Sequence, residues 1–481
     1  MLFPLVCLLG CRVAGEDYER PELDVPRAFS NAAAEGASPD GVGAWWDAFE
    51  DATLQGLVAD ALEGNVDLRI ALVRIREARA ARGIVEADLV PTIDVTGSYQ
   101  RTGQSREVVF GDFAPRAFDT FTTGLEARWE LDLWGRLRRA VEAASADIQV
   151  SVEDARALLV SVLAETALAY VDLRRFERQE AIALDNLALQ QQTVQLTERQ
   201  FEANLVSQLD VAQARSQQEG TRSAIPILRA GAQRARHRLA VLTGRNPGEL
   251  VGLGGAEAIG QIPAAVLGAV APPSELLRRR PDLRAAERAL AAQTARVGVS
   301  EGLLYPTLEL TGSLGYSALE LDDLPDNQAR FFGYGPAVRW NLFDRKRLRS
   351  AVAVEDTRVE QALAAYELTL LLALEDVENA LVDHRENRAR REALTLAVEE
   401  ARRAVQLSRE RYRQGLVAFQ SVLDTQRGLF QLEAELADTE AAISSALIGL
   451  YRALGGGWEE RDVMLLPEDG TDSDSLDPAA P

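Results

Sequence analysis

The chain has 481 residues and a formal net charge of −22, with 74 acidic against 52 basic side chains. This acidic balance argues against a nucleic-acid-binding surface, which needs clustered positive charge. Hydrophobic residues make up 47% of the chain and aromatic residues only 6%, a profile typical of long helices. Two cysteines and two histidines offer almost nothing from which to build a metal or thiol site, so no cofactor is expected.

The first eleven residues, MLFPLVCLLGC, form an apolar run that ends in the letters LLGC. This ending resembles a bacterial lipobox, in which cleavage precedes a cysteine that then carries acyl chains. We therefore expect lipidation of Cys11; the alternatives are an ordinary leader or a frayed apolar end. Residues 1–10 are expected to be a signal peptide with its start missing, because no Lys or Arg precedes the apolar run. An Asp directly after the acylated cysteine would favour retention in the inner membrane. Here Arg12 follows Cys11, which favours the outer membrane.

Two pairs of segments alternate between apolar and polar side chains, at residues 92–100 and 120–133 and again at 308–316 and 334–342. A period of two predicts β-strands. The strands fit either a soluble antiparallel sheet with one wet face or a transmembrane barrel with a water-filled interior. Four strands cannot close a barrel wide enough for a channel, because barrel diameter grows with strand number. The barrel interpretation therefore requires several chains.

Long helical runs follow each pair of strands. The first is predicted from near Arg136 to about Asn204, which at 1.5 Å per residue spans roughly 100 Å. Each run breaks once and returns, so each half of the chain is predicted to be a long antiparallel helical hairpin. Asn204 and Gly415 are the expected turn residues, since both tolerate the left-handed conformation that ends a helix. Pro226 is expected to kink or interrupt the first returning helix.

The two halves share one pattern at a constant offset of 211 residues, which pairs Phe201 with Tyr412 and Val211 with Val422. Small or apolar residues recur in the second half with steps of three and four, at Val422, Thr425, Leu429, Leu432, Leu436, Thr439, Ile443, Ala446 and Leu450. This average of 3.5 is a coiled-coil period. The same seam appears 211 residues earlier and continues upstream of both breaks, through Tyr412 and Phe201.

The order of these segments defines the expected domains. Residues 11–44 form the lipidated N-terminal extension, and residues 45–245 form a first repeat of helix, two strands and long hairpin. A linker at 246–274 leads to a second such repeat at 275–458. Residues 459–481 have the composition of a disordered acidic tail.

With both halves in view, the chain resembles the TolC-like outer-membrane efflux proteins, and most of all the lipoprotein branch that serves resistance-nodulation-division pumps. The resemblance runs from about Trp45 to Trp458. Its most specific passages are HRLAVLTGRNP, ELLRRRPDLRAAERAL, YPTLELTGSLGY, and WELDLWGR with its counterpart WNLFDR. It implies a mainly α fold with a transmembrane portion: a homotrimer whose twelve-stranded barrel, four strands per chain, crosses the outer membrane and continues as a helical coiled-coil tunnel.

The resemblance also implies the function. Such proteins catalyse no reaction and passively export small molecules that an inner-membrane pump and a periplasmic adaptor hand over. By motif position, Asp424 matches an acidic residue that rings the periplasmic aperture, Arg427 a basic residue that holds the closed state, and Asp210 the acidic position of the first hairpin. Gln420 stands where pump-linked relatives often carry Leu. The implied partners are two further copies, the adaptor, the pump and outer-membrane lipid.

Two alternative functions remain open at this stage. A duct for type I protein secretion shares the fold, although the lipobox and the RRRPDLRAAE segment resemble the pump-linked branch more. A periplasmic coiled-coil adaptor or scaffold with a soluble sheet is the other; such adaptors carry one hairpin, whereas this chain carries two. Ser, Asp and His are too scattered to indicate a hydrolase triad, so no enzymatic activity is expected.

Overall fold

A computed structural model describes residues 13–31, 43–103, 117–250, 253 and 272–458. The expected signal peptide, Cys11 and the acidic tail lie outside these described residues. The chain divides into two compact units. The first consists of Met1–Glu22, Arg74–Ser151 and Ala285–Glu367, and the second of Leu23–Val73, Val152–Arg284 and Leu368–Pro481. Four of the five points at which the chain crosses between the units fall within helices, and the fifth lies between Glu22 and Leu23.

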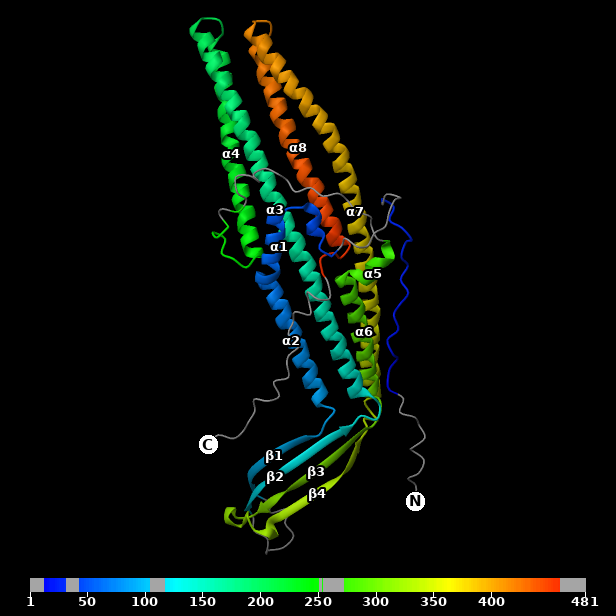
Figure 1. The fold of residues 1–481 in the computed structure, drawn as a ribbon. Helices are drawn as coiled ribbons and strands as arrows, with labels where there is room; N and C mark the ends of the chain where they lie inside the picture. The colour runs from blue at the N-terminus through cyan, green and yellow to red at the C-terminus, as the bar shows by residue number, and fades with distance from the viewer. Residues whose placement is uncertain (1–12, 32–42, 104–116, 251–252, 254–271, 459–481) are drawn as a thin grey trace. The chain divides into compact units, whose positions relative to one another are not determined.

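The first unit contains the sheet. Its strands are β1 (Thr92–Gly103), β2 (Ala117–Leu131), β3 (Thr307–Ala318) and β4 (Arg330–Arg339), and they pair antiparallel in the order β1-β2-β3-β4 (Figure 1). The four predicted strands are confirmed, but two predicted ends are wrong. Leu133 and Leu342 lie beyond β2 and β4, because the chain turns sharply there. The Leu133 N–H donates to the Leu131 carbonyl at 2.8 Å, and the Leu342 N–H to the Trp340 carbonyl at 3.1 Å.

Shorter helices precede the strands in both halves. The first half begins with a 3-10 turn (Trp45–Phe49), α1 (Ala52–Gly64) and α2 (Val66–Ala87). The second begins with a 3-10 turn (Pro273–Glu275), α5 (Leu276–Arg279) and α6 (Pro281–Gly302). Two further 3-10 turns, Leu321–Asp323 and Asn327–Ala329, connect β3 to β4. Asp51 starts α1 by accepting the N–H groups of Thr53 and Leu54, which satisfies two donors at the helix N-terminus.

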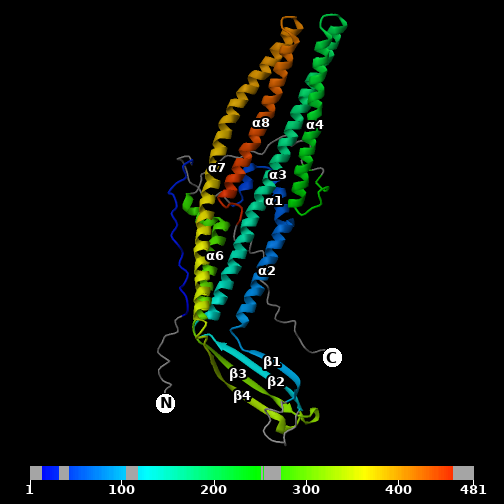
Figure 2. The same cartoon turned by 180° about the vertical axis from the view of Figure 1, so that it is seen from behind.

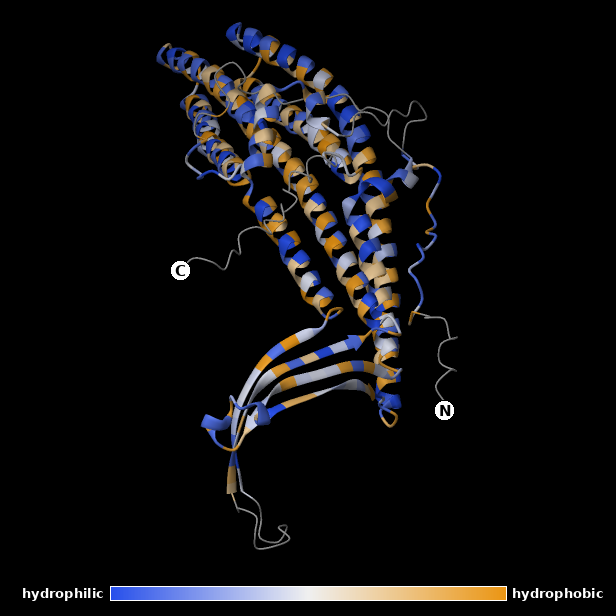
Figure 3. Ribbon diagram, turned by 60° about the horizontal axis from the view of Figure 1, so that its bottom comes forward, coloured by the Kyte–Doolittle hydropathy of each residue, from blue (hydrophilic) through white to orange (hydrophobic). Residues whose placement is uncertain are grey.

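The long hairpins are α3 (Arg136–Glu202) with α4 (Gln208–Leu242), and α7 (Arg345–Arg413) with α8 (Phe419–Ala453). Figures 1 and 2 show, from opposite sides, that α4 returns along α3 and α8 along α7. The predicted hairpins are therefore confirmed, and α3 begins at the predicted residue. Among the helices in the described part of the chain, none is both long enough and apolar enough to cross a membrane. Figure 3 shows hydrophilic and hydrophobic residues mixed along every long helix.

The 3.5-residue seam is confirmed on the returning helices. On α4 it is buried at Val211, Ala214, Thr221, Ile225, Ala232, Ala235 and Leu239, and on α8 none of its predicted positions is exposed. Phe201 is an exception, because its side chain is 42% exposed whereas its counterpart Tyr412 is 7% exposed. The Tyr412 ring packs on Phe419 with centroids 5.3 Å apart, but the first hairpin carries Gln208 at the position of Phe419 and offers Phe201 no such partner.

Pro226 does not interrupt α4, which runs unbroken from Gln208 to Leu242. The predicted interruption is therefore wrong, and the alternative of a kink stays a prediction. A proline removes only one backbone donor from the ladder of a helix. The neighbouring Thr221 and Ile225 are buried against the rest of the hairpin, and this packing holds the turn in place.

Candidate functional site

The sheet of the first unit has one apolar face that the described part of the chain leaves exposed. Cross-strand partners place Val95, Leu125, Leu314 and Phe332 in one row across all four strands. Their exposed fractions include 81% for Val95 and 73% for Phe332. Tyr334 and Val338, on the same face of β4, are 87% and 71% exposed. A soluble sheet buries its apolar face against a core, so this sheet is suited to an apolar surrounding instead.

The opposite face of the sheet is polar. The next row joins Asp94, Glu126 and Ser313, and a further row joins Thr92, Arg128 and Thr311. These side chains line a hollow of about 340 Å³. Figure 3 shows hydrophilic and hydrophobic residues alternating along the strands. One face is therefore compatible with water and the other with lipid, which is the arrangement of a transmembrane strand beside an aqueous interior.

A pair of glycines lets β2 and β3 approach closely at the middle of the sheet. Gly124 and Gly315 are cross-strand partners. A Cβ atom added to Gly315 would lie 2.3 Å from the carbonyl oxygen of Thr123, and one added to Gly124 would lie 2.6 Å from that of Leu314. Only glycine fits at either position without a backbone shift.

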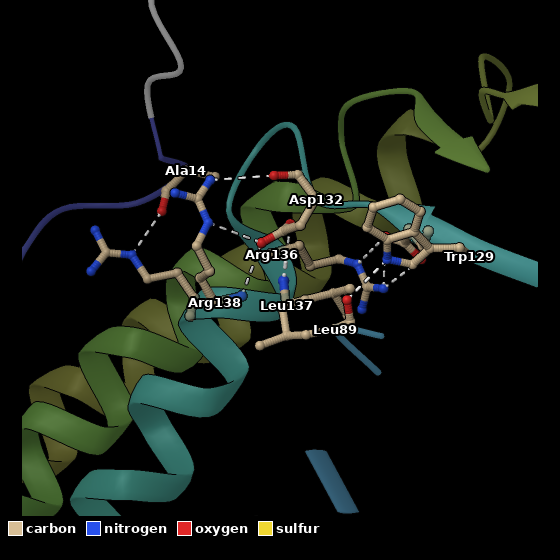
Figure 4. A network of polar contacts seen from close by, with 9 residues as sticks. Ala14, Leu89, Trp129, Asp132, Arg136, Leu137 and Arg138 are labelled. Carbon is tan, nitrogen blue, oxygen red and sulfur yellow. Dashed lines mark hydrogen bonds and ion pairs between the residues drawn. The ribbon is translucent and has the colours of Figure 1, made fainter. Parts of the chain in front are cut away.

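A polar network fixes the point where the sheet ends and α3 begins (Figure 4). The Trp129 indole N–H donates to the Leu89 carbonyl at 2.9 Å. Arg136 binds both carboxylate oxygens of Glu130, at 2.9 and 2.8 Å. The Asp132 carboxylate accepts the backbone N–H groups of Leu137 and Arg138, which satisfies donors at the N-terminus of α3. These residues belong to the motif WELDLWGR, whose role here is to orient the strand relative to the helix.

In the second unit, the two hairpin turns carry the residues that sequence reasoning singled out. Asn204 has a φ of 56° and Gly415 a φ of 71°, both in the left-handed region. After the first turn, Ser207 and Asp210 form a capping box: the Asp210 carboxylate accepts the Ser207 N–H at 3.0 Å, and the Ser207 hydroxyl accepts the Asp210 N–H at 3.3 Å. The Asp210 carboxylate thus stabilises the start of α4.

Beyond the second turn, Gln420, Asp424 and Arg427 lie on consecutive turns of α8. The Gln420 amide donates to Asp424 Oδ1 at 2.8 Å, and the Arg427 guanidinium lies 3.6 Å from the same oxygen. The guanidinium also donates twice to Gln217 Oε1 on α4, at 3.3 and 3.1 Å. Arg427 therefore joins the two hairpins. Gln217 was not among the residues that the sequence singled out, because a contact between hairpins leaves no local signal.

An apolar cluster next to the turns packs the four helices together. It consists of Val194, Ala214, Tyr412, Phe419, Val422 and Leu423. Burial raises the pKa of the Tyr412 hydroxyl, and the nearby Asp210 raises it further. Both hairpins contribute to the cluster, so apolar packing holds them together near the turns.

Nothing in the described residues fits a metal ion, because no three or more His, Cys, Asp or Glu side chains gather there with suitable geometry. The two histidines occupy the surface and a packed helix face. His237 is exposed, and His384 on α7 is 4% exposed. Burial lowers the pKa of His384, and the nearby Arg388 lowers it further.

Comparison with known proteins is consistent with this geometry. The family model for outer membrane efflux proteins matches residues 57–245 and 273–456. The chain is 32% identical to the outer membrane protein OprJ of Pseudomonas aeruginosa, with 94% of each chain covered. It is 31% identical to nodulation protein T of Rhizobium leguminosarum, over 94% of this chain and 95% of that relative. The solved structure of the outer-membrane channel OprN matches with a TM-score of 0.84 at 36% identity, covering 92% of this chain and 99% of that one.

A sheet with one lipid-compatible face, two long hairpins and the family match together define the class: the chain belongs to the outer membrane efflux protein family. It is a non-enzymatic outer-membrane channel of tripartite efflux systems and extends into the periplasm. It lies on the branch that includes OprJ, nodulation protein T and the cation efflux system protein CusC of Escherichia coli, to which it is 29% identical over 95% of this chain and 97% of that relative.

Proposed function

We propose that three copies of this chain close one twelve-stranded barrel in the outer membrane and that this homotrimer exports small molecules. It works with a periplasmic adaptor protein and an inner-membrane pump of the resistance-nodulation-division class. The observation that carries the proposal is the sheet: four strands with an exposed apolar face and a polar face. The channel itself is passive, and its substrates are delivered by the pump.

The free edges of the sheet support the assembly of several copies. Strands β1 and β4 each pair on one side only. An unpaired row of N–H and C=O groups cannot remain in hydrocarbon, where each unsatisfied group costs several kcal/mol. Pairing β1 of one copy with β4 of the next removes both edges, and closure by three copies leaves none. The apolar row through Val95 then faces lipid all the way round.

Cys11 is proposed as the site of acylation, on the strength of the lipobox-like letters that precede it. One acyl chain gives only marginal membrane binding, whereas several chains on one N-terminus anchor stably. The acyl chains would then add to the membrane attachment that the barrel already provides.

At the hairpin turns, we propose that Gln420, Asp424 and Arg427 line the periplasmic aperture, with Asp210 contributing from the first hairpin. Three copies of Asp424 around one axis would focus a negative potential and favour cations or cationic substrates. The two hydrogen bonds from Arg427 to Gln217 join the hairpins in the arrangement described, which we propose is the closed one. Because Gln420 donates to Asp424, this aperture is polar at the position where Leu is common among the pump-linked relatives.

A labelling experiment in intact outer membranes tests the orientation of the sheet. Val95→Cys and Thr96→Cys place thiols on adjacent residues of β1 that point to opposite faces. We expect a membrane-confined maleimide to label Val95→Cys and a water-soluble maleimide to label Thr96→Cys. Equal labelling of both variants by the water-soluble reagent would mean that the apolar face is not in lipid, and the proposal would fail.

A further inference from the structure

A row of buried polar side chains runs along one face of α3 in the second unit, and one of them, Thr193, is bonded to Gln426 of α8. On α3 it consists of Asn186, Gln190, Thr193 and Thr197, and on α8 of Gln426; we call these five residues the polar seam. Their exposed fractions are between 0% and 7%, with 2% for Gln190 and 1% for Gln426. Along α3 the spacing is four, three and four residues, so the side chains share one face of the helix.

The polar seam is weakly bonded. The hydroxyls of Thr193 and Thr197 donate to carbonyls of their own helix, at 3.0 and 2.8 Å. Between the two helices, the Gln426 amide donates to Thr193 Oγ1 at 3.0 Å. Within the described residues, neither polar atom of the Gln190 side-chain amide has a hydrogen-bond partner, and the same holds for the amide nitrogen of Asn186 and the amide oxygen of Gln426.

Other contacts join the same helices next to the polar seam. The apolar cluster, whose α3 member Val194 lies between Thr193 and Thr197, packs the four helices together. Away from the turns, Arg175 and Gln179 of α3 bind the Asp438 carboxylate of α8, at 3.2 and 2.7 Å. Among the described residues, the unpartnered amide atoms of Asn186, Gln190 and Gln426 therefore lie next to contacts that hold the same helices.

A buried amide without a partner has lost the hydrogen bonds that water gives it, and it recovers them when the two helices part. Replacing such a group by an apolar one of the same shape therefore strengthens the contact. We propose that the polar seam weakens the contact between the two hairpins and so sets how readily they separate when the aperture opens. This inference rests on the proposed function, since it concerns the regulation of the proposed aperture.

The test is Gln190→Met, which keeps the length of the side chain and removes the amide. Gln191→Met is the matched control, because Gln191 is exposed on the same helix. The full-length protein is purified, its thermal midpoint is measured, and single-channel recordings in planar bilayers give the ratio of open to closed time. Relative to the control, we expect Gln190→Met to raise the midpoint and to lower this ratio by about tenfold.

Asn186→Leu tests the neighbouring position of the polar seam. We expect it, too, to raise the thermal midpoint and to lower the ratio of open to closed time. A Gln190→Met protein that matches its control in open time, or opens more, overturns the inference, and so does one with a lowered midpoint. The proposed function fails in a different way: wild-type protein that forms no channel, or openings that are insensitive to Arg427→Ala, contradicts the channel or the aperture assignment. The midpoint comparison of Gln190→Met with its control still stands in that case.

Discussion

Arg427→Ala removes one of the polar contacts that join the two hairpins, the one at the proposed aperture. The wild-type guanidinium donates to Gln217 Oε1 at 3.3 and 3.1 Å and lies 3.6 Å from Asp424 Oδ1. The ion pair contributes little, because both side chains are more than half exposed, at 58% and 57%. With the hydrogen bonds to the amide, the loss is about 1 kcal/mol per chain. That corresponds to roughly a fivefold shift toward the open state for one chain.

Three chains that open together would add these losses, giving about 3 kcal/mol and a shift on the order of 100-fold. Chains that move independently would show only the single-chain shift. The ratio of open to closed time in planar bilayers distinguishes concerted opening of the three chains from independent opening. Gln217→Ala, which removes the acceptor on α4, should reproduce most of the effect, and adding it to Arg427→Ala should change little further.

Arg215→Ala is the control. Arg215 pairs with Glu198 at 2.7 Å and is 64% exposed, but this pair joins α4 to α3 within the first hairpin. Its removal costs a similar amount of stability and should leave the open time unchanged. An equal rise in the ratio of open to closed time for Arg427→Ala and Arg215→Ala would refute the reasoning. The longer open time would then come from a general weakening of the helices and not from loss of the link between the hairpins.

The remaining predictions concern the sheet and the buried histidine. Leu314→Lys, on the apolar face of β3, should lower the yield of membrane-inserted protein, because a lysine facing lipid costs up to about 2–4 kcal/mol near mid-bilayer. Ser313→Lys, on the polar face, should insert normally. Quantitative blots of outer-membrane fractions compare the two variants. Gly315→Ala should destabilise by about 1–3 kcal/mol in thermal unfolding, because its Cβ would lie 2.3 Å from a carbonyl oxygen, whereas Gly97→Ala meets no atom within 4 Å and should be neutral. Burial lowers the pKa of His384, so the unfolded state binds a proton more readily than the folded state. The free energy of unfolding should therefore be highest above about pH 6.5 and fall on acidification below it. His384→Asn should flatten this part of the profile of stability against pH.

Periodicity in the sequence was enough to predict the duplicated architecture. The period of two located all four strands, and the 3.5-residue period located the buried stripe of α4 from Val211 to Leu239. Both signals are local, because the side chains that share a face are set by the geometry of one element. The ends of β2 and β4 were less predictable, since sharp turns after Leu131 and Trp340 override the alternating pattern.

Contacts between segments far apart in the sequence were not predictable. The close approach of Gly124 and Gly315 depends on the register of β2 against β3, which no local pattern specifies. The same applies to Gln217, which lies 210 residues from its partner Arg427. Gln190 continues the predicted 3.5-residue pattern upstream of the first turn, but no local pattern specifies that its buried amide lacks a hydrogen-bond partner within the described residues.

The central claim is that three chains together complete a channel that one chain cannot form. Full-length protein extracted from outer membranes is separated by size, and the monomer and trimer fractions are added in turn to planar bilayers. The account predicts stable single-channel conductance from the trimer fraction and none from the monomer. Conductance carried by the monomer, or a trimer that never conducts, would contradict it.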